Sequence, residues 1–71
     1  MNFSARLKQI RTERHLTQKD VYTAVGMSML GYQRYEYGDR SPAFEQLIAL
    51  ADYFDVSLDY LVGRSDDPTR H

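Results

Sequence analysis

The sequence contains no cysteine, and this absence excludes several kinds of chemistry. Disulfides, thiolate metal sites and cysteine-based catalysis are ruled out, which suits a reducing cytoplasm. The two histidines, His15 and His71, lie far apart in the chain, so we expect no metal site. A domain of at most 71 residues must therefore gain its stability from packing and self-association.

Long apolar runs are also missing, and none approaches the roughly 20 residues that a membrane-spanning helix needs. The first residues lead directly to the charged Arg6 and Lys8, unlike a secretion signal. We therefore expect a soluble, cytoplasmic protein with no membrane partner. The chain has no Gly-rich phosphate loop and no nucleophile beside a base, so we expect no enzyme, cofactor or small-molecule ligand.

An excess of positive charge is absent too, since the formal net charge is -1. The two halves nevertheless differ. Residues 1–40 hold seven Lys/Arg and four Asp/Glu, whereas residues 41–71 hold two Arg and six Asp/Glu. This asymmetry indicates one face turned toward an anion, although an uneven distribution of ordinary surface charge would look the same.

Hydrophobic periodicity predicts five short helices, and Thr17, Ser28 and Ser57 are the expected N-caps. Gly26, Gly38 and Gly63 are the expected helix ends. The predicted helices cover residues 3–14, 17–25, 29–37, 43–54 and 58–62. The sequence thus predicts an all-α, compact five-helix domain over residues 1–63, followed by a short flexible tail over residues 64–71.

Residues 17–35 carry the functional signal. Two helices separated by a short Gly-containing turn cross steeply and leave the second helix exposed. In this geometry a helix enters the major groove of DNA while its partner crosses the backbone. Several motifs stand in order along the chain: RLKQIRTERHLTQKDV, VGMS, RYEYG, RSP and LIALADYFDVSLDYLVGR.

With these motifs the chain resembles the lambda-repressor-like helix-turn-helix proteins of the Cro/repressor (XRE) family over roughly residues 4–63. The resemblance implies that Gln18 opens the second helix at a phosphate. It also implies that the early residues of the third helix read bases, and that two copies pair near the C-terminal end. Tyr22 departs from the family, which commonly has Ala there, and Asp39 would repel phosphate. We expect Tyr22 to pack beside the third helix near Gly31, with Gly31 and the large Tyr32 as the compensation for its size.

One face of the third helix carries the expected base-reading residues, which are Met29, Leu30, Gln33 and Arg34. Arginine can read guanine, glutamine can read adenine, and apolar groups can contact the thymine methyl. In an alternative interpretation, Met29 and Leu30 belong to the core or to a protein interface. The expected DNA-backbone residues are Gln18, Lys19, Arg11, Arg14 and Arg40, although each could instead be merely solvated.

The function that these observations predict is sequence-specific binding of double-stranded DNA by a transcriptional regulator, as a repressor. We expect a homodimer through the C-terminal helices, because the consecutive Tyr60, Leu61 and Val62 cannot all point inward. The alternative is a helix-turn-helix protein-interaction module such as an antitoxin or antirepressor, which the net charge and Asp39 would suit.

Overall fold

The structure is a computed structural model that describes residues 1–70, and these residues form five α-helices without a strand. This confirms the predicted all-α fold, and each predicted boundary lies within one residue of the observed one. The helices are α1 (Phe3–Glu13), α2 (Gln18–Ala24), α3 (Met29–Tyr37), α4 (Phe44–Phe54) and α5 (Leu58–Leu61).

Side-chain caps fix where most of the helices begin. Thr17 and Asp20 form a reciprocal capping box, in which the Thr17 Oγ1 accepts from the Asp20 amide at 3.0 Å and the Asp20 Oδ2 accepts from the Thr17 amide at 2.9 Å. Ser28 and Ser57 cap α3 and α5 as predicted. Asn2, which the periodicity did not single out, caps α1. The polar residues before each apolar segment therefore set these starts locally.

Left-handed backbone ends α3 and the last helix. Gly38 closes α3 with a φ of 83°, a conformation in which a side chain would be strained. Gly63 follows α5 with a φ of 85°, and a Cβ built there would overlap the carbonyl oxygen of Met1. The glycine thus allows the start of the chain to pack against the end of α5.

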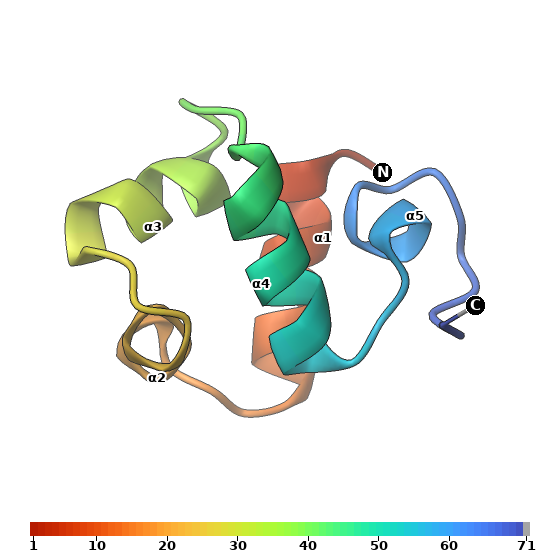
Figure 1. The fold of residues 1–71 in the computed structure, drawn as a ribbon, viewed down its shortest axis with the longest axis horizontal. Coiled ribbons are helices and arrows are strands. Elements are labelled where there is room, and N and C mark those ends of the chain that lie inside the picture. The colour runs from red at the N-terminus through yellow and green to blue at the C-terminus, as the bar shows by residue number, and fades with distance from the viewer. Residues whose placement is uncertain (71) are drawn as a thin grey trace.

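The core lies where the five helices meet, and every helix contributes to it. Figure 1 shows α2 and α3 on one side of α1 and α4, and α5 with the following segment on the other side. The arrangement leaves α3 at the edge of the molecule, where its outer face is open. The buried apolar residues are Leu7, Ile10, Val21, Tyr32, Tyr35, Leu50, Ala51, Phe54, Val56 and Leu61.

Tyr22 lies beside the third helix as expected, and it contacts one of the two residues that we expect to accommodate it. Its ring packs against the ring of Tyr32, with 6.4 Å between the ring centroids. A Cβ built at Gly31 would meet the Ser28 Oγ at 3.0 Å and no atom of Tyr22 within 4 Å. The larger side chain is therefore accommodated by a second tyrosine and not by the space beside Gly31.

The segment after α5 folds back onto the helices. The Ser57 amide donates to the Pro68 carbonyl at 3.0 Å, and the Arg70 guanidinium donates to Asp52 at 2.7 Å. Asp66 pairs with Arg6 at 3.1 Å, and that guanidinium also lies over the Tyr60 ring. The predicted boundary at residue 63 stays a prediction, and residue 71 of the expected tail lies outside the described residues.

Candidate nucleic-acid interface

The exposed first half of α3 is the centre of the candidate site. Tyr32 and Tyr35 are buried and form the inner face of the helix. Met29 and Leu30 stay 54% and 56% exposed, and Arg34 is exposed as well. The core therefore does not use Met29 or Leu30, which removes one of the two alternatives left open for this apolar pair.

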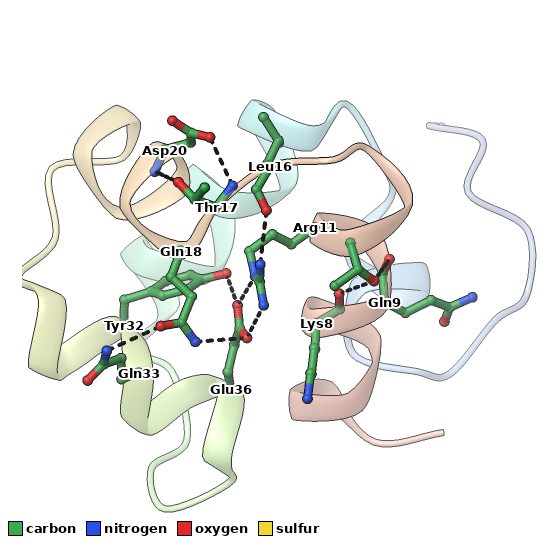
Figure 2. Close-up of polar contacts among 11 residues, drawn as sticks. Lys8, Gln9, Arg11, Leu16, Thr17, Gln18, Asp20, Tyr32, Gln33 and Glu36 are labelled. Carbon is green, nitrogen blue, oxygen red and sulfur yellow. Dashed lines mark hydrogen bonds and ion pairs between the residues drawn. The ribbon is translucent and has the colours of Figure 1, made fainter.

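Behind this face lies a buried carboxylate that sequence analysis did not single out. Glu36 has a side chain that is only 2% exposed, and four groups donate hydrogen bonds to it (Figure 2). Its Oε2 accepts from the Arg11 Nε at 2.6 Å and from the Tyr32 hydroxyl at 2.6 Å. Its Oε1 accepts from the Arg11 Nη2 at 3.0 Å and from the Gln18 Nε2 at 3.2 Å. Glu36 thus joins α1, α2 and α3.

The charge of Glu36 is stabilised despite its burial. Burial alone would raise the pKa of this carboxyl, but the hydrogen bonds from Arg11, Tyr32 and Gln18 outweigh that effect and lower it. The hydrogen bond to Glu36 raises the pKa of Arg11 in turn. Burial, followed by the bond to Glu36, raises the pKa of the Tyr32 hydroxyl. At neutral pH the cluster is an ion pair with a neutral phenol that donates.

Two amide side chains extend this cluster to the surface. Gln18, the first residue of α2, donates to Glu36 and accepts from the Gln33 Nε2 at 3.2 Å. Figure 2 shows Gln33, Gln18 and the Glu36 carboxylate one after another, joined by dashed lines, with Gln18 in the middle. The structure therefore brings together one expected backbone-contact residue and one expected base-reading residue.

The other expected backbone-contact residues occupy different places. Lys19 and Arg40 are exposed, on α2 and in the turn between α3 and α4. Arg14 is exposed as well, but its guanidinium lies 5.4 Å from the ring centroid of Phe54, near the end of α4. Arg11 turns inward, where it binds Glu36 and donates to the Leu16 carbonyl at 2.9 Å. Each of its three guanidinium nitrogens donates to an acceptor of the protein itself, and the phosphate contact expected of Arg11 stays a prediction.

The spacing of two residues in the sequence weakly indicated the hydrogen-bonded cluster around Glu36. Glu36 stands four residues after Tyr32, so the two side chains share a face of one helix. That face is otherwise buried, and an acid there requires a cationic partner. The partner, Arg11, is 25 residues away on another helix, so the pattern within α3 could not identify it.

Two further findings bear on function. Among residues 1–70, no helix is long and apolar enough to cross a membrane. No group of three or more His, Asp or Glu in that part of the chain is placed to hold a metal ion.

Known sequences and structures resemble this chain over nearly its whole length. A family profile described as "Helix-turn-helix" matches residues 7–61. The HTH-type transcriptional regulator YobD of Bacillus subtilis is 35% identical over 66 residues, which are 93% of this chain and 59% of that protein. The cryptic phage CTXphi transcriptional repressor RstR of Vibrio cholerae is 34% identical over 64 residues, 90% of this chain and 57% of that protein.

The chain thus spans less than two thirds of the length of these relatives. Among solved structures, the P22 c2 repressor in complex with a synthetic operator has a TM-score of 0.84 and 25% identity, covering 92% of this chain and 98% of that one. The residues matched by the family profile, 7–61, include the turn between α2 and α3 and the helices that support this turn. The chain belongs to the lambda-repressor-like, XRE-type family of helix-turn-helix proteins.

Proposed function

We propose that the protein is a sequence-specific DNA-binding transcriptional repressor that inserts α3 into the major groove. The observation that carries this proposal is the exposed set of Met29, Leu30 and Arg34 on α3, beside Gln18 at the start of α2. Apolar, guanidinium and amide groups are the ones that read base edges in the major groove. The names of the relatives and the operator complex of the P22 c2 repressor support it.

In this proposal Gln18, Lys19 and Arg40 contact the DNA backbone, and the N-terminus of α2 adds its amide dipoles at a phosphate. Arg11 acts differently, because it holds Glu36 and through it Gln18. Arg14 is placed toward α4 and contributes to the positive field of this half of the chain. A cytoplasmic location follows from the proposed role.

Replacing Arg34 with alanine should weaken binding to the preferred site by about 1–3 kcal/mol and relax the preference at one base pair. A bidentate guanidinium contact to guanine is lost, while the backbone contacts remain. The preferred site is first selected from a random DNA pool with the wild-type protein. Binding of both proteins to that site and to random DNA is then measured by fluorescence anisotropy.

Arg64→Ala is the matched control, since it removes one positive charge from an exposed residue in the segment after α5. Figure 1 shows that segment on the far side of the molecule from α3. Arg64→Ala should leave the preference unchanged. Equal weakening of specific and random DNA by Arg34→Ala would contradict the base-reading role. The salt dependence of wild-type binding separates DNA binding from a protein-interaction module, because contact with phosphates releases counterions.

We further propose a homodimer on a two-fold symmetric operator, with half-sites about 34 Å apart. The apolar side chains available for pairing lie on the C-terminal helices. Leu61 is fully buried, Tyr60 and Val62 are half-buried, and Tyr53 and Leu58 are exposed. Tyr53 and Leu58 are therefore the residues that we place in the interface.

Leu58→Asp should raise the dissociation constant of the dimer, on the order of tenfold or more, because it buries a charge in an apolar interface. The fold should tolerate it, since Leu58 is exposed and an acid is favourable in the first turn of a helix. Sedimentation at several concentrations, with and without operator DNA, measures the effect. A single wild-type monomer bound to a full two-fold site would exclude the dimer.

A further inference from the structure

Residues 64–70 form a strap that is fixed at its start to the interior of the domain. Asp66 accepts a hydrogen bond from the Arg6 guanidinium at 3.1 Å, and this guanidinium lies 3.8 Å from the centroid of the Tyr60 ring. Arg6 is only 3% exposed. A buried guanidinium that loses its carboxylate partner is unfavourable, so this end of the strap should stay in place.

The other end of the strap is held by contacts on the surface. Arg70 donates to Asp52 at 2.7 Å and lies 3.6 Å from the Asp55 carboxylate, near the end of α4. The three side chains are 44%, 59% and 86% exposed. Exposed ion pairs contribute little to stability and are screened by salt. The strap is therefore attached firmly at Asp66 and weakly at Arg70.

Between these two attachments the strap forms one wall of a surface hollow of about 320 Å³. Figure 1 shows the strap curving around α5, whose start forms the other wall. Asp67 and Arg70 line the hollow from the strap, and Leu58 lines it from α5. Leu58 is 39% exposed and is one of the two residues that we place in the dimer interface. The strap therefore borders the surface that a second copy would use.

A hollow at this place does not suit two-fold pairing. In a two-fold dimer centred on Leu58, the same patch of both copies meets itself, so each hollow would face another hollow. The cores of dimer interfaces are packed as densely as protein interiors, whereas two facing hollows leave a void. The wall that can move is the strap, because exposed ion pairs and one hydrogen bond from the Ser57 amide to the Pro68 carbonyl hold it there.

We propose that the strap is autoinhibitory and keeps two copies of the free protein from pairing through Leu58. Pairing requires Arg70 to release Asp52 and Asp55, so that the strap swings away from α5 about its fixed end at Asp66. Only copies with a released strap pair, and the apparent dissociation constant rises as their fraction falls. This inference rests on the proposed homodimer and adds the contact that limits its formation.

Arg70→Ala should therefore tighten the dimer of the full chain in the absence of DNA. Loss of the exposed ion pairs shifts the attachment by about threefold in each copy. Because both copies must release, the dissociation constant should fall on the order of tenfold. Sedimentation at several concentrations measures the change.

Arg64→Ala is the matched control, since it removes the same charge from the same strap and leaves Arg70 with its two partners. Residues 41–71 hold six Asp/Glu and two Arg, so the loss of a positive charge should by itself increase repulsion between two copies. The control should therefore pair no more tightly than the wild-type protein, and general electrostatics would not tighten the dimer of Arg70→Ala.

The attachment itself is measured in the monomer, at concentrations well below the dissociation constant, by hydrogen exchange of the Ser57 amide. This amide donates to the Pro68 carbonyl at 3.0 Å and should exchange about threefold faster in Arg70→Ala. The Gly31 amide, which donates to the Ser28 Oγ at the start of α3, should exchange as before. Unchanged exchange of the Ser57 amide would overturn the inference.

The sedimentation outcomes separate this inference from the proposed homodimer. A wild-type dimer that Arg70→Ala leaves unchanged or weakens would overturn the autoinhibitory role but keep the homodimer. Equal tightening by Arg64→Ala and Arg70→Ala would assign the effect to charge alone and would overturn that role too. Monomers of every variant at all concentrations, with and without operator DNA, would instead remove the homodimer on which the inference rests.

Discussion

Replacing Glu36 with alanine should lower the free energy of unfolding by about 3–5 kcal/mol, because it leaves a largely buried guanidinium without its counter-charge. The Arg11 side chain is only 13% exposed, and Glu36 accepts two of its hydrogen bonds. The Tyr32 hydroxyl, which is also buried, loses its acceptor. Urea unfolding followed by circular dichroism at low temperature gives the free energy for both proteins.

Asp52→Ala is the matched control, since it also removes one carboxylate from an ion pair with arginine. Asp52 and its partner Arg70 are both exposed, and such pairs contribute little to stability. The control should therefore unfold near the urea midpoint of the wild-type protein. Equal and small effects of both substitutions would show that the buried ion pair does not stabilise the fold.

The difference in the free energy of unfolding between the wild-type protein and Glu36→Ala should depend on pH. The folded protein lowers the pKa of Glu36 below its value of about 4.3 in an unfolded chain. The stabilisation by the charged form is therefore present above that value and is lost as the pH falls through the lower folded pKa. The difference in stability between the wild-type protein and Glu36→Ala should shrink on acidification from pH 7. A constant difference would mean that the charge of Glu36 is not its source.

Replacing Phe54 with alanine should cost about 3–5 kcal/mol, since it opens a cavity in the centre of the core. Phe54 is 0% exposed and packs with Leu50, Val56 and Leu61 in the same cluster. Thermal and urea unfolding measure the loss. In so small a domain this is a large share of the total stability, so the variant should be partly unfolded at 37 °C.

Phe44→Ala removes the same side chain from the other end of α4. Phe44 is 68% exposed, so its loss should change the stability by less than about 0.5 kcal/mol. Helix propensity is matched, because both substitutions replace phenylalanine by alanine in one helix. Similar losses for the two variants would contradict the observed core.

The helices of this protein were predictable because their signals are local. Thr17, Ser28 and Ser57 cap the helices that they precede, and Gly38 ends α3, as the sequence indicated. Cap and turn chemistry depends on residues within four positions of each other. The motif order, read against a known family, likewise predicted the turn between α2 and α3 and the exposed Met29.

The contacts of the charged residues were not predictable in this way. The sequence could mark Arg11 as a positive charge, but not that it faces Glu36, 25 residues away. Arg6 was equally unremarkable, yet it is buried and pairs with Asp66, 60 residues away. Such partners depend on how the helices cross, which side-chain packing across the whole core determines.

The sequence by itself therefore determined the class of fold, the positions of the five helices and the face of α3 that is open to a ligand. Periodicity and capping act over a few residues, so a single chain is enough to reveal them. Only the tertiary structure decided that Arg11 is internal and that Glu36 joins it to Gln18, which in turn accepts a hydrogen bond from Gln33. These hydrogen bonds need donors and acceptors from three helices within about 3 Å, a proximity that forms only when the helices pack.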